Sequence, residues 1–422
     1  MDGSHERALY FYVTIVIGLI VAGGLFLDGA AAVGGFVELQ LRPARLLNDF
    51  FSDTGVGAAL INAALVGAVG LVLVAITQVR LSGPTIAAVF TMIGFGLFGK
   101  TPFNAIPIIA GVALAARIAG KTFSAYILIA LFGTALGPLV STLAVEIVPG
   151  TMGIFAGIIG GLLVGILLPP AAMAMLRLHQ GFSLYNIGLT SGFLGLFAAA
   201  FLRALTTEMP APPFSWATEV PIPVVLAVPV LALSLIVLAF VLGGGSATRE
   251  FLRIQELPGR LPSDFLDMVG PAGGLMNMGV MAILLWTLVW ILGAPFNGPV
   301  LGGILTVVGF SAFGNHPRNS WSVMAGVLLG TLLFRVAPSS PGPVLAILFV
   351  TTLAPLAGEF GAPIGLVAGF IHLAIVLQTG SWHAGINLYN NGFAGGLTAT
   401  LIVAVIEWYQ SNRETLFRKD TE

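Results

Sequence analysis

The sequence predicts an all-α polytopic membrane protein made of two homologous repeats, and three observations carry this prediction. Hydrophobic residues make up 57% of the 422 residues, and charged residues make up 8%. A soluble domain carries about 25% charged residues because water must solvate its surface, so this surface faces lipid. The third observation is an internal duplication. A soluble enzyme is excluded, and with a formal net charge of −1 so is a nucleic-acid-binding protein.

Apolar stretches long enough to cross a bilayer, roughly 20 residues each, occur in two series. The first covers about 8–28, 56–77, 103–118, 123–147 and 151–176, and the second about 221–243, 273–293, 320–336, 342–357 and 362–380. The first stretch lacks a cationic leader and a cleavage site, so we expect it to be a retained span. The sequence therefore predicts about ten full spans.

Four further apolar segments begin with helix breakers and are predicted to be re-entrant or half-length helices. They are 84–98, 185–202, 299–313 and 389–406. Two mixed stretches, 36–51 and 251–266, combine Arg, Gln and Asp with Leu and Phe. We expect these two to lie as amphipathic connectors near the membrane interface.

An ungapped comparison of the chain with itself reveals the duplication. A shift of 215 residues places Arg45, Asp49, Asn62 and Gly83-Pro84 on Arg260, Asp264, Asn277 and Gly298-Pro299. A shift of 217 matches Leu131-Phe132, Thr134 and Pro138 to Leu348-Phe349, Thr351 and Pro355, and a shift of 204 matches 179–188 to 383–392. The predicted organisation is a first repeat at 1–203, a proline-rich linker at 204–220, a second repeat at 221–410 and a polar tail at 411–422.

The relative orientation of the repeats depends on how many segments cross the membrane. Five full spans per repeat make the second repeat inverted, and six make the repeats parallel. Basic residues concentrate in cytoplasmic loops. The inverted arrangement places ten basic residues, Lys100 among them, on the cytoplasmic side against seven outside, whereas the parallel one splits them nine to eight. The count favours inverted repeats with both termini in the cytoplasm.

Interrupted segments at matching positions of two repeats indicate a solute site near the bilayer midplane. Backbone groups without helical partners are tolerated within a membrane where protein or a water-filled cavity surrounds them. Most of the candidate ionisable residues lie near the predicted span ends, so we expect a nearly uncharged pathway. Such a lining suits a neutral, hydrogen-bonding solute better than an ion.

The candidate pathway residues are the polar and aromatic positions that recur in both repeats. For solute binding these are Thr91, Phe95, Phe98, Tyr185, Asn186, Asn62, Thr306, Phe310, Phe313, Tyr389, Asn390 and Asn277, with His179 and His383 as candidate gating residues. Each of these positions also has a purely structural interpretation. The asparagines can cap helices (Asn186 and Asn390) or form hydrogen bonds between helices (Asn62 and Asn277), and the threonines can bond back to their own helix. The aromatic rings can pack in the core, and each histidine can form a fixed hydrogen bond.

The repeated Gly-Pro segments, the Gly-Phe-x-x-Phe-Gly motif and the later Leu-Tyr-Asn stretch resemble the urea transporter family. The chain as a whole also resembles an uncharacterised family of bacterial integral membrane proteins with a tandem duplicated domain of unknown function. The first resemblance implies a homotrimer with one pore per subunit. It also implies aromatic slots at Phe95, Phe98, Phe310 and Phe313, and polar ladders at Tyr185, Asn186, Tyr389, Asn390, Thr91 and Thr306.

The predicted function is a channel-like transporter in the cytoplasmic membrane for a small neutral polar solute of the urea or amide class. The expected partners are that solute, membrane lipid and further copies of the chain, and no cofactor or metal is expected. One alternative is an ion- or proton-coupled secondary transporter with a midplane site. Another is a membrane-embedded enzyme, although we find no His-Glu-x-x-His or Gly-x-Ser-x-Gly motif for one.

Overall fold

The computed structural model describes residues 3–205 and 215–418, and every regular element in these two ranges is helical. Part of the predicted linker, at 206–214, and the last four residues of the predicted tail lie outside them. The helices of the first repeat are α1 (Gly3–Asp28), α2 (Ala30–Leu39), α3 (Phe50–Thr54), α4 (Val56–Ile76), α5 (Gly83–Phe95), α6 (Pro102–Ile118), α7 (Ile127–Gly133), α8 (Gly137–Thr142), α9 (Thr151–His179) and α10 (Asn186–Leu205).

The second repeat has a counterpart for each of these helices, in the same order. They are α11 (Ile222–Gly243), α12 (Ser246–Ile254), α13 (Phe265–Met268), α14 (Pro271–Leu292), α15 (Gly298–Phe310), α16 (Pro317–Phe334), α17 (Pro341–Phe349), α18 (Ala354–Phe360), α19 (Ala362–Trp382) and α20 (Asn390–Arg418). Helix α20 thus continues into the stretch predicted as a polar tail.

Within the described ranges, ten helical segments are long and apolar enough to cross a membrane, which confirms the predicted class. The membership of the ten differs from the prediction. Helices α10 and α20 are full-length rather than half-length, since each starts at an Asn and then runs on without a breaker. Helices α6 and α16, predicted as full spans, are not among the ten.

The short helices α5 and α15, 13 residues each, match the predicted half-length segments and pack against each other at the centre. Gly83 at the start of α5 lies against Phe313, just beyond the end of α15, and Gly298 at the start of α15 lies against Leu97, just beyond α5. The two helices therefore run antiparallel. Their close approach depends on glycine, since an added Cβ on Gly94 would stand 2.5 Å from the carbonyl of Gly302.

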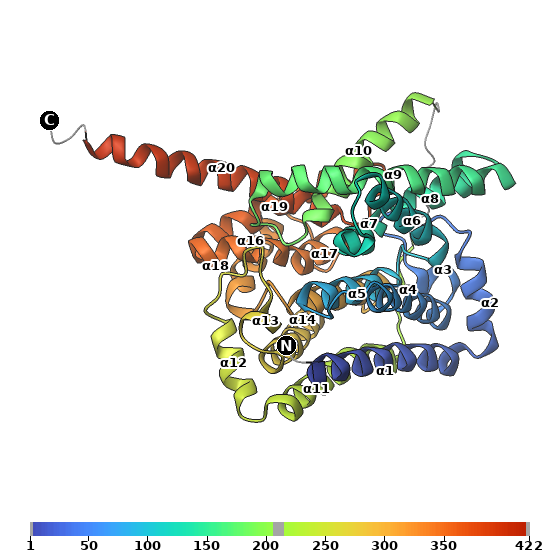
Figure 1. Cartoon of the computed structure of the whole chain (residues 1–422), viewed down its shortest axis with the longest axis horizontal. Coiled ribbons are helices and arrows are strands. Elements are labelled where there is room, and N and C mark those ends of the chain that lie inside the picture. Colours follow the sequence, from blue (N-terminus) through green and yellow to red (C-terminus); the bar gives the residue numbers. More distant parts are fainter. Residues whose placement is uncertain (1–2, 206–214, 419–422) are drawn as a thin grey trace.

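Helices α10 and α20 obey the same symmetry. They cross where the counterparts Gly188 and Gly392 face each other, and Gly195, further along α10, faces Asn387, which precedes α20. Figure 1 shows α2 on one side of the molecule and its counterpart α12 on the opposite side. For helices that cross a bilayer, antiparallel counterparts mean inverted repeats.

Two of the predicted full spans are interrupted near their centres. In 123–147, a 3₁₀ turn at Thr134–Leu136 separates α7 from α8, and in 341–360 a 3₁₀ turn at Val350–Leu353 separates α17 from α18. The prolines Pro138 and Pro355 begin the second halves. A proline has no N–H to continue the preceding hydrogen-bond ladder, so the helix changes its pitch before it.

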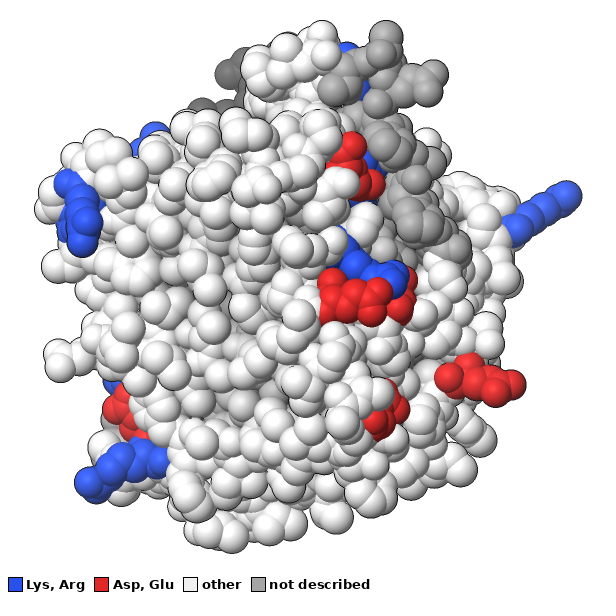
Figure 2. All heavy atoms as spheres, turned by 90° about the vertical axis from the view of Figure 1, so that its right-hand side faces the viewer, with Lys and Arg blue, Asp and Glu red and all other residues white. Residues whose placement is uncertain are grey.

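The outer surface carries large apolar side chains, as a lipid-facing protein requires. Phe26 is 83% exposed, Leu332 74% and Val241 73%. Figure 2 shows one face of the molecule, on which charged side chains form a few separate groups between wide uncharged areas. An apolar surface of this extent is typical of contact with lipid or with other membrane helices.

Candidate functional site

Each half-length helix is capped by an aspartate from the other repeat. The carboxylate of Asp264 accepts the N–H of Gly83 at 3.2 and 3.3 Å, and Asp49 accepts the N–H of Gly298 at 3.2 Å. A helix start presents unpaired N–H groups and a partial positive charge, which a carboxylate satisfies. The exchange fixes the position of each half-helix relative to the opposite repeat.

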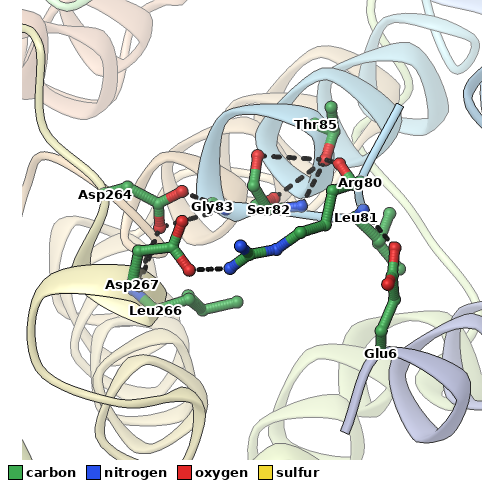
Figure 3. A network of polar contacts seen from close by, with 9 residues as sticks. All are labelled: Glu6, Arg80, Leu81, Ser82, Gly83, Thr85, Asp264, Leu266 and Asp267. Atoms are coloured by element: carbon green, nitrogen blue, oxygen red, sulfur yellow. Dashed lines mark hydrogen bonds and ion pairs between the residues drawn. The ribbon is translucent and has the colours of Figure 1, made fainter. Parts of the chain in front are cut away.

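Figure 3 shows how further contacts hold the start of α5. Asp264 points at the Gly83 amide, while the neighbouring Asp267 forms an ion pair with Arg80. The carboxylate of Glu6, from α1, accepts the N–H of Leu81 at 2.9 Å. This end of α5 is therefore tied to both α1 and the connector that precedes α13.

A cavity of about 670 Å³ lies where the half-helices meet the starts of α10 and α20. Most of the predicted binding residues line it: Thr91, Phe95, Tyr185, Asn186, Thr306, Phe310, Phe313 and Tyr389. Phe98, Asn390, Asn62, Asn277 and both candidate gating histidines do not line it. The cavity is of a size that holds small organic molecules, and its lining is mainly apolar with a few polar groups.

Two groups of aromatic rings flank the cavity, and each combines residues of both repeats. The first aromatic cluster consists of Phe95, Phe98, Phe349 and Tyr389. Within it, the ring centroid of Phe95 lies 4.6 Å from those of Phe98 and Tyr389. The centroid of Phe349 lies 5.7 Å from that of Phe95.

The second aromatic cluster is the symmetry counterpart of the first and consists of Phe310, Phe313, Phe132 and Tyr185. The centroid of Phe310 lies 5.0 Å from that of Phe313 and 4.4 Å from that of Tyr185. The centroid of Phe132 lies 5.5 Å from that of Phe310. The distances in the two clusters agree within 0.4 Å, so the duplication preserves the packing and not just the sequence.

The two clusters differ in whether a lysine donates to the tyrosine hydroxyl. Lys100, fully buried, donates from Nζ to the hydroxyl of Tyr389 at 2.5 Å. Its Nζ also lies 4.7 Å from the ring centroid of Tyr389 and 5.4 Å from that of Phe95, within the range of cation–π attraction. Its counterpart is Asn315, whose amide donates to the carbonyl of Val307 at 3.4 Å. Lys100 thus lies in the connection between α5 and α6, as expected for a loop residue, but its side chain is buried rather than exposed to water.

The loops before α10 and α20 are held by the interrupted helices of the opposite repeat. The N–H of Leu184 donates to the carbonyl of Thr352 at 2.9 Å, and the N–H of Leu388 donates to the carbonyl of Ala135 at 2.9 Å. These carbonyls are available because the 3₁₀ turns interrupt the helical hydrogen bonds. The interruptions thus position Tyr185 and Tyr389, which directly follow the two leucines.

The asparagines that begin α10 and α20 tie these helices to the histidines. Nε2 of His179 lies 3.0 Å from Oδ1 of Asn186, and Nε2 of His383 lies 3.0 Å from Oδ1 of Asn390. Nδ1 of His179 accepts the N–H of Ser183 at 3.3 Å, which makes Nε2 the protonated nitrogen of a neutral ring. Both histidines are buried away from the cavity, so the geometry favours the fixed hydrogen bond over gating.

The predicted Asn62 and Asn277 support the half-helices from behind. The amide of Asn62 donates to the carbonyl of Lys100 at 2.7 Å, and that of Asn277 donates to the carbonyl of Asn315 at 3.0 Å. These contacts satisfy carbonyls that the helix ends leave unpaired. The structure thus brings both asparagines to the backbone of the counterpart positions Lys100 and Asn315.

The cavity extends to the surface on one face. Its lining includes the exposed Arg177, at the end of α9, and Pro262, in the connector before α13. The counterpart positions Ser381 and Leu47 do not line it. On that opposite face Arg45 is buried and forms an ion pair with Glu146 at 2.9 Å.

A family model described as "Protein of unknown function (DUF1576)" matches residues 29–204 and 245–408. The chain belongs to this family. One matched region falls in each repeat of the DUF1576 chain, which agrees with an internal duplication. No curated protein and no solved structure matches it. The resemblance to a duplicated family of unknown function is thus confirmed, whereas no comparison supports the likeness to urea transporters.

Sequence reasoning missed three residues of this DUF1576 site: Phe132, Phe349 and Lys100. The two phenylalanines were present in the aligned repeats, but the segments around them are predicted as ordinary spans. Lys100 follows a glycine and resembles a loop cation. Its mismatch with Asn315, between the matched pairs Gly99/Gly314 and Pro102/Pro317, was the available signal. In the described residues, no three His, Asp or Glu side chains come together as metal ligands.

Proposed function

We propose that this protein conducts a small neutral polar solute, of the urea or amide class, across a membrane. One observation carries the proposal: a largely apolar cavity of about 670 Å³ lies where two antiparallel half-helices meet, flanked by two matching aromatic clusters. Flat rings suit a flat solute, and the hydroxyls of Thr91, Thr306, Tyr185 and Tyr389 supply hydrogen bonds without carrying charge.

The test is solute flux into proteoliposomes, followed by light scattering after rapid mixing with urea or acetamide. We expect flux well above that of empty vesicles and independent of any proton or sodium gradient. Thr306→Phe should block it by filling the cavity. The matched control Leu332→Trp changes a lipid-facing residue and should leave it intact. Equal flux in protein-free and protein-containing vesicles, with monodisperse protein, would refute the proposal.

A coupled secondary transporter is the second candidate, and the buried Lys100 is the observation that favours it. Ionisable residues inside a membrane protein often mark proton or ion pathways. In that case imposing a proton gradient changes the steady-state accumulation of solute, and Lys100→Met abolishes the change. An unaltered steady state under the gradient rejects coupling while leaving the channel intact.

We also propose a homotrimer, which the resemblance implies, and a location in the cytoplasmic membrane with both termini inside, which the count of basic residues favours. The exposed apolar side chains of the outer surface provide area for contacts between copies. Native mass spectrometry gives the stoichiometry. Because the sequence contains no cysteine, single introduced cysteines near either terminus can be labelled selectively from one side of intact cells.

A further inference from the structure

Lys100 holds more hydrogen-bonding capacity than its surroundings use. A lysine carries up to three N–H donors, and its side chain is fully buried with the Tyr389 hydroxyl as its hydrogen-bond partner in the described residues. The rings of Phe95 and Tyr389 lie 5.4 and 4.7 Å from its Nζ. This arrangement is costly for a group that serves packing alone, because burying a polar group with unused hydrogen-bond donors destabilises a protein.

The contact with Lys100 decides what the Tyr389 hydroxyl can do. Lysine donates, so the tyrosine oxygen accepts, at a distance of 2.5 Å. The proton of the hydroxyl is then left to donate elsewhere, and Tyr389 lines the cavity. A hydroxyl polarised in this way is a stronger donor, because hydrogen bonds in a chain reinforce one another. The counterpart Tyr185 lacks this support, since Asn315 donates instead to the carbonyl of Val307.

Thr91 supplies the complementary acceptor. Its hydroxyl is buried, lines the cavity and has no hydrogen-bond partner among the described residues. Its counterpart Thr306 donates to the carbonyl of Gly302 in its own helix at 2.8 Å. Thr91 lies one turn before Phe95 on α5, and residues four apart share a helix face. Thr91 is therefore on the same face of α5 as Phe95, whose ring centroid lies 4.6 Å from that of Tyr389.

We propose that Tyr389 and Thr91 form an amide-binding subsite on the α5 side of the cavity, with Lys100 as the residue that positions the Tyr389 hydroxyl. The carbonyl oxygen of the solute accepts from Tyr389, an N–H donates to Thr91, and the flat face of the solute lies against Phe95. The subsite rests on the proposed function, and it assigns recognition to one half of a symmetric site.

Urea and thiourea provide the matched probes, because they have similar shapes and sulfur is a weak hydrogen-bond acceptor. We expect wild-type proteoliposomes to pass urea about tenfold faster than thiourea, the size of effect that one polarised hydrogen bond supplies. Tyr389→Phe should bring the ratio to within about twofold, and Tyr185→Phe should lower it less, because no lysine polarises the Tyr185 hydroxyl. Thr91→Val should slow urea more than Thr306→Val does.

The positioning role of Lys100 is tested by the same ratio. Lys100→Met should lower it as far as Tyr389→Phe, and the double variant should match either single one, because both changes remove the same hydrogen bond. A wild-type ratio in Tyr389→Phe, or an equal loss in Tyr185→Phe, overturns the subsite while the channel stands. If Lys100→Met does not yield folded protein, the two tyrosine variants decide. If the wild type passes neither solute, the proposed function itself falls.

Discussion

The two aromatic clusters have the same geometry and different chemistry. Their ring spacings agree within 0.4 Å, and each joins a half-helix of one repeat to an interrupted helix and a tyrosine of the other. Lys100 donates to the hydroxyl of Tyr389, whereas its counterpart Asn315 donates to a backbone carbonyl and not to the hydroxyl of Tyr185. The comparison indicates that the duplication supplies a symmetric scaffold, and that single side chains then make the two halves of the site unequal.

We expect the largest effect from substitutions that force the half-helices α5 and α15 apart. In Gly94→Val and Gly302→Val, an added Cβ would stand 2.5 and 2.4 Å from the facing carbonyl, closer than packed atoms allow. We expect each variant to lose about 3 kcal/mol or more of stability and to give little monodisperse protein by size-exclusion chromatography. Gly18→Val is the control, because nothing lies within 4 Å of that position. Normal yield from both half-helix variants would contradict the packing.

Removing the exchanged caps should have a smaller effect that is similar in the two halves. Asp49→Ala and Asp264→Ala each leave the start of a half-helix unpaired, and we expect a loss of about 2 kcal/mol for either variant. The measurement is the melting temperature in detergent. The control, Glu219→Ala, removes an exposed carboxylate. A loss confined to one of the two aspartates would show that the caps are not equivalent.

Lys100 and Asn315 allow the difference between the clusters to be tested directly. We expect Lys100→Met to raise stability by about 1 kcal/mol, since it removes a buried polar group that has one hydrogen-bond partner and unused donors. Asn315→Lys should lower it by a similar or larger amount. Both are measured by thermal unfolding in detergent. A clear loss of stability in Lys100→Met would mean that the lysine serves the fold rather than the solute.

A further expected effect is a pH dependence of stability at the cap Asp49. Burial raises the pKa of Asp49 to about 6, against three backbone N–H donors that lower it. Because the folded-state pKa exceeds the unfolded value of about 3.9, the folded protein binds this proton more tightly. Its stabilising contribution is present below pH 4 and is lost as the pH rises through 6. Asp49→Asn should remove this decline, and identical melting curves for wild type and variant at pH 4 and pH 7 would disprove it.

Most of the fold and much of the site could be predicted from the sequence, because the duplication shows which polar and aromatic residues recur at matching positions. Thr91, Tyr185, Phe310 and Tyr389 were all found as polar or aromatic positions that recur in both repeats, and all line one cavity. The lengths of α10 and α20 were mispredicted, since an Asn at a helix start resembles a break within a helix. Apolar composition cannot distinguish these two cases.

What the sequence did not reveal depends on contacts between repeats. The involvement of Phe132 and Phe349 follows from 3₁₀ turns that redirect their helices, and periodicity does not report such turns. Lys100 was assigned to a loop because a charge in apolar sequence normally marks a membrane boundary. Its burial arises from Tyr389, which lies 289 residues further along the chain. A pair so distant is set by the tertiary fold.

The most direct test of the account is to locate a solute in the molecule. The compound to soak into crystals is 2-bromoacetamide. It keeps the carbonyl and N–H groups of an amide and adds a bromine with anomalous scattering. The chain has no cysteine for this compound to alkylate. The account predicts an anomalous peak in the cavity between Phe310 and Tyr389, lost in Thr306→Phe. A peak confined to the lipid-facing surface, or a cavity without bromine at saturating concentration, would contradict it.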